Sequence, residues 1–182
     1  HRAAHHSEAR LEVTGMEVRL FLEIGAGGIL LGGLYALIAA GLNLQYGLMR
    51  VLNVAHGEFV MLGAYVTYTL YTSLGLSPLL GLVLQLPLFF LLGWGIYGLV
   101  YRGVLEQGGG PAQLEANSLL LSFGLLFILE NLALAVWGPS LRGYQYLHHP
   151  VSVLGTLFPV NRLVALGVAL LLTVLLLGFL HR

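Results

Sequence analysis

The side chains best suited to chemistry in this sequence lie in one short stretch, residues 43–58. Asn43 and Gln45 begin the stretch, and Asn53, His56 and Glu58 end it, the last three within the segment MRVLNVAHGEFVMLGAY. Amide, imidazole and carboxylate groups can all hydrogen-bond a polar solute. A metal site is not predicted, because no third ligand lies at a useful spacing and no H-E-x-x-H motif occurs.

Covalent catalysis is not predicted either. A serine nucleophile needs a histidine base beside it, whereas Ser122 lies in the apolar run LLLSFGLL without a recognisable partner. The absence of cysteine excludes a thiolate nucleophile and a disulfide framework. No phosphate-binding P-loop occurs, so any coupling to ATP must come from another subunit. No cofactor is predicted.

The composition indicates the environment of these side chains. Of the 182 residues, 58% are hydrophobic and 9% charged, and the mean hydropathy is +0.87. Soluble domains are about 45–50% apolar and about 25% charged, so a soluble enzyme of this composition is excluded. The net charge of zero argues against a nucleic-acid surface. The predicted fold class is all-α, a polytopic integral membrane helix bundle.

Charge-free apolar runs predict about five transmembrane helices, each of about 20 residues. They are predicted at residues 24–49, twice within 59–101, from a cap at Asn117 or Ser118 to Trp137, and at 163–180. Gly75, Ser77 and Pro78 mark the turn inside the second run. An irregular connection is predicted at residues 138–161. Residues 1–20 are predicted to be a disordered or non-native tail, and residues 21–182 the transmembrane domain.

The polar stretch between the first two helices is too apolar for an aqueous loop and too polar for lipid contact. A discontinuous helix reconciles these properties, because Gly57 permits a departure from helical geometry and irregular backbone is tolerated at membrane depth inside protein or beside a water-filled cavity. Transporters build substrate pathways in this way. The alternative is a short turn facing the lipid headgroups. The pathway hypothesis assigns Asn43, Gln45, Asn53, His56, Gly57 and Glu58 to the translocation pathway.

Glu130 and its neighbour Asn131 lie inside the fourth predicted helix. An ionisable group at that depth is costly unless it is paired, protonated or hydrated, so we also assign both residues to the candidate pathway. The alternative is a protonated Glu130 that hydrogen-bonds a neighbouring helix.

Glycine is not confined to loops in this sequence. In lipid, small residues allow helices to approach closely and pack. We therefore expect helix-packing roles for Gly28 and Gly32, which have small-xxx-small spacing, and for Gly63, Gly93 and Gly98.

Residues 32–65, GGLYALIAAGLNLQYGLMRVLNVAHGEFVMLGAY, resemble the hallmark of the branched-chain amino-acid ABC transporter permeases, LivH-like subunit. The most specific element is N-x-A-H-G-E, which falls on Asn53, Ala55, His56, Gly57 and Glu58. The resemblance covers essentially residues 16–182. Similar permeases carry an amide at the position of Glu130, and they continue beyond the equivalent of Arg182 into a segment that docks on the ATPase. This chain therefore resembles the N-terminal part only, and the domain is expected to be incomplete at its C-terminus.

The resemblance implies a transport subunit in the bacterial inner (plasma) membrane. Its implied partners are a second homologous permease subunit (LivM-like), two cytoplasmic ATPase subunits and a periplasmic substrate-binding protein. The implied substrates are branched-chain amino acids or related small amino acids and amides. The alternative function is a non-transporting membrane scaffold or assembly subunit, which would act through its glycine-rich faces alone.

Overall fold

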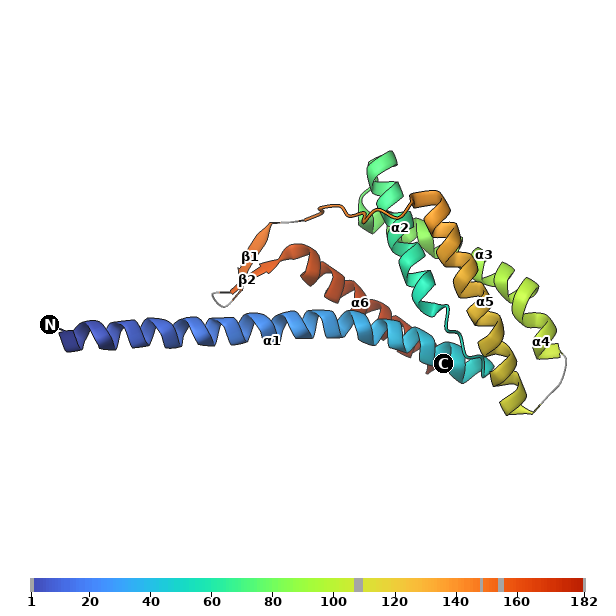
Figure 1. Cartoon of the computed structure of the whole chain (residues 1–182), viewed down its shortest axis with the longest axis horizontal. Coiled ribbons are helices and arrows are strands. Elements are labelled where there is room, and N and C mark those ends of the chain that lie inside the picture. Colours follow the sequence, from blue (N-terminus) through green and yellow to red (C-terminus); the bar gives the residue numbers. More distant parts are fainter. Residues whose placement is uncertain (1, 107–109, 148, 154–155, 182) are drawn as a thin grey trace. The chain divides into compact units, whose positions relative to one another are not determined.

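The computed structural model describes residues 2–106, 110–147, 149–153 and 156–181, with the backbone alone for residues 2–15, 18–19, 150, 152–153 and 156–158. The chain divides into two compact units, His1–Gly41 with Gln145–Arg182 and Leu42–Tyr144. The described part is dominated by helices (Figure 1).

The first unit contains the N-terminal part of α1 (Arg2–Met49) together with α6 (Val160–Leu180). Before α6, β1 (Pro150–Val153) and β2 (Thr156–Pro159) form an antiparallel hairpin in which Pro150 lies opposite Pro159. The sequence predicted only an irregular connection here. Each strand has only four residues; β1 begins with Pro150 and β2 ends with Pro159. Proline cannot donate to a ladder, so the pattern was too short to indicate a sheet.

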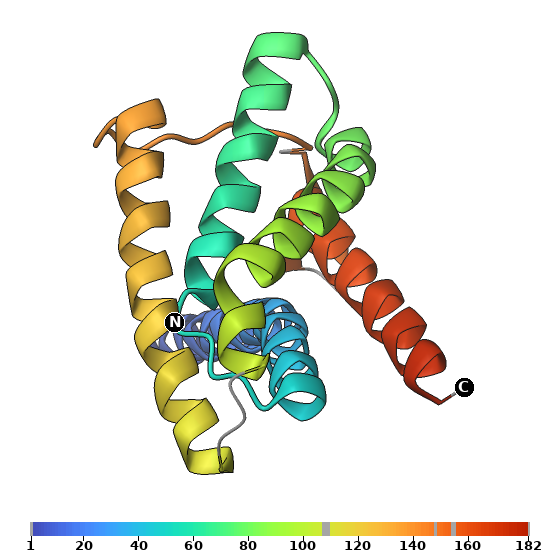
Figure 2. The same cartoon turned by 90° about the vertical axis from the view of Figure 1, so that its right-hand side faces the viewer.

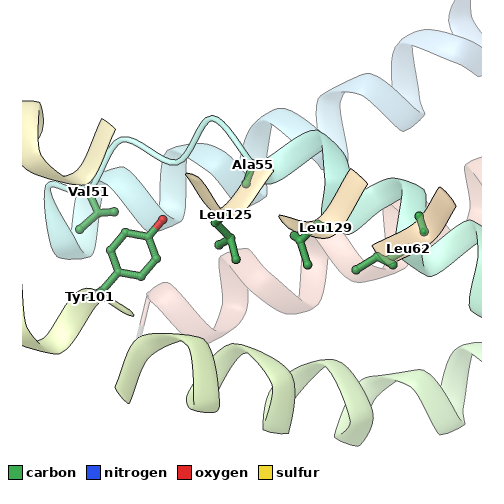
Figure 3. Close-up of a cluster of buried hydrophobic side chains, with 7 residues drawn as sticks. Val51, Ala55, Leu62, Tyr101, Leu125 and Leu129 are labelled. Carbon is green, nitrogen blue, oxygen red and sulfur yellow. The ribbon is translucent and has the colours of Figure 1, made fainter. Parts of the chain in front are cut away.

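The second unit packs α2 (His56–Leu74) against α3 (Pro78–Ile96) and α5 (Pro111–Trp137) (Figures 1 and 2). A five-residue π-helical turn, η1 (Tyr97–Tyr101), and the short α4 (Arg102–Glu106) continue α3 toward the α5 connection. The buried apolar side chains of this unit form one cluster, which Figure 3 shows in part: Val51, Ala55, Leu62, Tyr101, Leu125, Leu129 and Ala133.

The turn between α2 and α3 confirms the prediction made from Gly75, Ser77 and Pro78. Gly75 ends α2 in the left-handed conformation, with φ of 65°, which glycine adopts without a Cβ penalty. The Ser77 side chain accepts a hydrogen bond from the Leu80 N–H at 3.4 Å. Pro78 occupies the first position of α3, where its missing N–H is not needed.

The described residues include four helices that are long and apolar enough to cross a membrane. They are Leu20–Met49, Pro78–Glu106, Pro111–Trp137 and Val160–Leu180. Helix α2 occupies the range of the remaining predicted span but is not among them, because His56, Glu58 and several Tyr and Thr residues lower its hydropathy. The fold class of a polytopic helical membrane protein is confirmed.

Three predicted boundaries are wrong in detail. Helix α5 begins at Pro111 after Gly110, so neither Asn117 nor Ser118 caps it; Pro at the first helical position suits that start. The third predicted span ended at Tyr101, but the helix continues to Glu106, supported by the Arg102–Glu106 ion pair at 2.7 Å. Helix α1 begins at Arg2, inside the range predicted as a disordered tail.

Candidate functional site: the break between the first two helices

The break between α1 and α2 consists of residues 50–55, which are not helical. Arg50 ends α1 with φ of 53°, and its N–H donates to the Tyr46 carbonyl at 2.8 Å. A left-handed conformation is unusual for a residue with a Cβ. The predicted interruption beside Gly57 therefore lies a few residues earlier in the chain, and Gly57 is the second residue of α2.

Side chains of the break alternate between the interior and the surface of the unit. Val51, Asn53 and Ala55 are buried, at 1%, 9% and 0% exposure, whereas Leu52 and Val54 are 37% and 38% exposed. Residues 54 and 55 form a turn, in which the His56 N–H donates to the Asn53 carbonyl at 3.3 Å. The break therefore turns the Asn53 side chain inward.

Two serines of α5 bind the backbone of the break. The Leu52 N–H donates to Ser118 Oγ at 3.1 Å, and the Val54 N–H donates to Ser122 Oγ at 3.1 Å. Ser122 Oγ also lies 3.2 Å from the Leu52 carbonyl oxygen, to which it can donate. Both serines are fully buried. Irregular backbone in a membrane must find its hydrogen-bond partners inside the protein. These serines supply the acceptors that helix carbonyls would otherwise provide.

The serines belong to the buried stripe of α5, which runs along the face turned toward the break and α2. Its members recur every three or four residues, as one face of a helix requires: Ser118, Ser122, Leu125, Leu129 and Ala133. A further bond from the Tyr46 hydroxyl to Glu115 Oε1, at 2.7 Å, joins the end of α1 to the same helix. The end of α1 and the break are thus both anchored on α5.

A cavity of about 300 Å³ lies beside the break, and we call it the Asn53 cavity. Its lining residues are Gln45, Met49, Asn53, His56, Phe59, Phe89, Gly93, Ile96, Tyr97 and Tyr101. Most of these are apolar or aromatic, with a few amide, imidazole and hydroxyl groups among them. No Asp, Glu, Lys or Arg belongs to this lining, which is the usual composition of a site for a small uncharged ligand.

Two buried polar atoms on residues that line the Asn53 cavity have no hydrogen-bond partner in the described part of the chain: Asn53 Oδ1 and the Tyr101 hydroxyl. The other end of the Asn53 amide is engaged, because Nδ2 donates to Gln45 Oε1 at 3.2 Å. Figure 3 shows the Tyr101 ring beside Val51, with its hydroxyl directed into the cluster. Buried polar atoms are nearly always bonded, so these two atoms are exceptions within the described part of the chain.

Only some of the predicted pathway residues line the Asn53 cavity. Gln45, Asn53 and His56 line the Asn53 cavity. Asn43 and Gly57 are exposed and Glu58 is half-buried, and none of the three lines the cavity. Glu58 lies in the first turn of α2, where a carboxylate suits the helix dipole.

Glu130 and Asn131 lie on the exposed side of α5, next to its buried stripe. The Asn131 Nδ2 donates to the Phe127 carbonyl of the same helix at 2.7 Å. Neither residue lines the Asn53 cavity. The structure therefore does not bring them together with the break.

The predicted packing glycines also differ in their surroundings. A Cβ at Gly63 would lie 3.6 Å from Gln85 Oε1 of α3, in ordinary contact. Nothing in the described structure lies within 4 Å of a Cβ at Gly28, Gly32, Gly93 or Gly98, the other predicted packing glycines. The closest approach occurs at Gly33, where a Cβ would collide with Leu166 Cδ1 of α6.

Sequence reasoning missed Ser118, Ser122 and Tyr101 as functional residues. Ser118 is one of two alternative caps that the sequence predicts, with Asn117 as the other, and Ser122 has no partner that the sequence indicates. Their partners are backbone amides 66 and 68 residues away, which no local pattern indicates. The four-residue spacing of two serines in an apolar helix was the one available signal.

The family described as branched-chain amino acid transport system / permease component matches residues 25–182. The high-affinity branched-chain amino acid transport system permease protein LivH of Escherichia coli K12 is 34% identical over 119 residues, which cover 61% of this chain and 37% of that protein.

Two further relatives come from other organisms. The permease protein BraD of Pseudomonas aeruginosa is 28% identical over 63% of this chain and 38% of its own length. A probable branched-chain amino acid transport permease protein LivH of Methanocaldococcus jannaschii is 38% identical over 41% of this chain and 22% of its own length. The chain thus spans well under half the length of these relatives. No solved structure matches it significantly.

Proposed function

Because the chain belongs to the family of permease components of branched-chain amino acid transport systems, we propose that it is a membrane-spanning permease subunit of an ATP-driven importer. Its substrates are branched-chain amino acids or related small amino acids and amides. The importer resides in the bacterial inner (plasma) membrane. The multi-pass helical fold and the relatives named for such transport support this proposal.

The observation that carries the pathway assignment is the buried break with its adjoining Asn53 cavity. Ser118 and Ser122 lie seven and eleven residues after the start of the 27-residue α5. At about 1.5 Å per residue, this is about 10 and 16 Å along a helix of about 40 Å. A hydrocarbon layer of about 30 Å centred on α5 would then include the break, about 5–11 Å below its surface.

This position favours a pathway element over a headgroup-level turn. A turn at the surface would expose its amides to water, whereas the Leu52 and Val54 amides bind serines that are fully buried. Such an internally bonded, non-helical segment beside a cavity is the arrangement with which transporters contact solutes. In alternating access, the break is the element that the solute passes.

The remaining machinery is assigned to other chains. A periplasmic binding protein delivers the solute, a second homologous permease subunit (LivM-like) forms the other wall of the pathway, and two cytoplasmic ATPase subunits drive the cycle. The large exposed side chains along α1, α3, α5 and α6 are suited to lipid or to such helical partners. Glu130 is exposed on a membrane-spanning helix, so in the assembly we place it against protein or water.

Leucine uptake tests this proposal. The full-length protein is reconstituted with its ATPases and binding protein in proteoliposomes, and uptake of radiolabelled L-leucine is measured. Asn53→Leu and His56→Leu are each expected to reduce uptake at least about ten-fold, equivalent to about 1.4 kcal/mol, while the complex still assembles. Thr72→Val is the control, because Thr72 is exposed and bonds only the Tyr68 carbonyl of its own helix.

Unchanged uptake in both cavity variants, with assembly intact, would remove the break from the pathway. Normal assembly without any ATP-dependent uptake by the wild-type complex would instead favour the scaffold function.

A further inference from the structure

A second cavity, of about 200 Å³, lies between α1 and α6 within the first unit, and we call it the α1–α6 groove. The two helices meet beside it, where Gly33 faces the Leu166 side chain. Leu30 is buried at 6% exposure, whereas Leu31 and Leu34 are 47% and 37% exposed, so the groove opens to the surface of the unit. The complete lining is Leu30, Leu31, Leu34, Asn161, Arg162 and Ala165.

Arg162 is the one charged residue that lines the α1–α6 groove. The structure describes the side chains of four arginines, and three of them, Arg50, Arg102 and Arg142, contact an aromatic ring, a carboxylate or a carbonyl of the chain. Arg162 is exposed and has no such contact with any described residue. A guanidinium offers five N–H donors and a permanent positive charge, so the partners available to Arg162 are water and anions outside the described chain.

Helix α6 places Arg162 at the edge of the hydrocarbon layer. Its 21 residues extend about 31 Å at 1.5 Å per residue, which matches the thickness of that layer, about 30 Å. Arg162 is the third residue of the helix, so its long side chain can reach the lipid headgroups. Ala165, almost one turn deeper, lies at the level of the acyl chains.

The remaining lining of the groove favours a hydrocarbon chain over a water-soluble ligand. Leu30, Leu31, Leu34 and Ala165 offer apolar side chains only. The volume is below the range of about 300–1,000 Å³ that is usual for small-molecule sites, so the groove suits a stretch of one acyl chain whose headgroup stays outside. Neither Asp nor Glu lines it, which leaves the amine of a zwitterionic headgroup without a partner there and favours a lipid with net negative charge.

We propose that the α1–α6 groove binds one anionic phospholipid, whose acyl chain packs against Leu31 and Leu34 while its phosphate pairs with the Arg162 guanidinium. The Asn161 Oδ1 atom is enclosed, so Arg162 supplies the charged contact. A lipid held in this way bridges α1 and α6 and stabilises the first unit. The inference goes beyond the proposed function, because it concerns a lipid bound to the first unit and makes no use of the transported solute.

Native mass spectrometry tests this binding. The full-length protein in nonionic detergent is titrated with phosphatidylglycerol, with phosphatidylcholine of the same acyl chains, and with inorganic phosphate. The first phosphatidylglycerol is expected to bind at least about five-fold more tightly than the first phosphatidylcholine, since one basic residue near a membrane surface contributes about that factor. Inorganic phosphate lacks the acyl chain and is expected not to bind at millimolar concentration.

Variants of the lining separate the two parts of the site. Arg162→Gln is expected to remove the preference for phosphatidylglycerol, Arg162→Lys to keep most of it, and Leu34→Asn to weaken both lipids several-fold. The matched controls are Arg142→Gln, which removes the same charge outside the groove, and Leu171→Asn, which places the same amide at an exposed position of α6 outside the groove. Both controls are expected to bind like the wild type, and the melting temperature of each variant confirms that it folds.

Photolabelling locates the lipid. Phosphatidylglycerol with a diazirine in its acyl chain is expected to label residues 30–34 or 161–165, both in detergent and in the complete transporter in nanodiscs. The inference is overturned if both lipids bind the wild type equally, if Arg162→Gln keeps the preference, if inorganic phosphate binds as tightly as the lipid, or if the label falls elsewhere because a helix of another subunit fills the groove. These measurements need neither ATP nor leucine, so their failure is distinguishable from a failure of uptake.

Discussion

Replacing Ser118 and Ser122 together by alanine is expected to release the break from α5. Each substitution leaves a backbone N–H, that of Leu52 or Val54, without its acceptor. An unsatisfied buried amide costs about 1–3 kcal/mol. Since both serines bind the same segment, their effects will not add fully, and we expect the double variant to lose about 2–4 kcal/mol of stability.

Thermal unfolding and cysteine labelling measure this loss. At about 2–4 °C per kcal/mol for a chain of this size, the melting temperature in detergent should fall by about 4–16 °C. The chain has no cysteine, so Ala55→Cys introduces one reporter at a fully buried position of the break. Its alkylation rate should rise at least about ten-fold in the double-alanine background, because local opening exposes the thiol.

The control for this experiment is Thr72→Val, which removes a hydroxyl that bonds only a carbonyl of its own helix. It should change the melting temperature little and leave the labelling rate unaltered. If the double alanine variant behaves like this control in both assays, the serines do not hold the break, and the reasoning from unsatisfied amides is refuted.

Three further predictions concern helix contacts, a helix end and a tyrosine. Gly33→Val should destabilise the protein by about 0.5–1.5 kcal/mol, because the flexible end of the Leu166 side chain must leave its preferred rotamer; this is measured as a lower melting temperature that Leu166→Ala restores. Gly75→Ala should cost about 1–2 kcal/mol in the same assay, because alanine is strained at φ of 65°. Burial, and secondarily the neighbouring Tyr71, raises the pKa of Tyr144 above 10.0, so its phenol should ionise at higher pH than free tyrosine. The contribution of Tyr144 to stability should be complete below pH of about 10 and decline as the pH rises through its folded pKa, as followed by ultraviolet absorbance and unfolding.

Each of these predictions has a matched control. Gly28→Val places the same side chain on α1 where nothing lies within 4 Å, and it should not destabilise the isolated chain comparably. Gly124→Ala, inside α5 and also in open space, should be neutral or stabilising, because alanine favours helix by about 1 kcal/mol. Tyr144→Phe should remove the raised ionisation. Equal effects of Gly28→Val and Gly33→Val would contradict the contact with Leu166.

Local chemistry made some elements predictable from sequence. The turn at Gly75, Ser77 and Pro78 combines a left-handed glycine, a capping serine and a first-turn proline, all neighbours along the chain. The helix ranges followed from apolar runs whose length matches a bilayer. Such features depend on residues that are close in sequence.

The geometry of the break could not be predicted in the same way. Glycine at position 57 suggested the point of departure, yet Arg50 adopts the left-handed conformation instead. The reason is tertiary: serines of α5 accept the amides of Leu52 and Val54. A sequence pattern locates a polar segment but does not identify which distant hydroxyls will bind its backbone.

The Asn53 cavity also depends on tertiary contacts that the sequence does not indicate. Gln45 and Asn53 were both candidates by residue type, but their mutual hydrogen bond, which leaves the buried Asn53 Oδ1 without a partner in the described residues, is visible only in the structure. Tyr101 is the last residue of the apolar run that is predicted to hold two spans. The π-helical turn that contains Tyr101 continues the helix, so this tyrosine becomes a wall of the cavity.

That wider turn gives the helix an unusual tolerance to changes in length. In η1 the Arg102 N–H bonds the Tyr97 carbonyl, five residues back, so the turn holds one residue more than an α-helical turn. Deleting a single residue here would restore α-helical hydrogen bonds without interrupting the helix. Because five residues in the wider turn cover about the same rotation as four residues in an α-helical turn, the Arg102–Glu106 pair would keep its direction around the axis. Homologues one residue shorter at this point should therefore present their charged end toward the same neighbour.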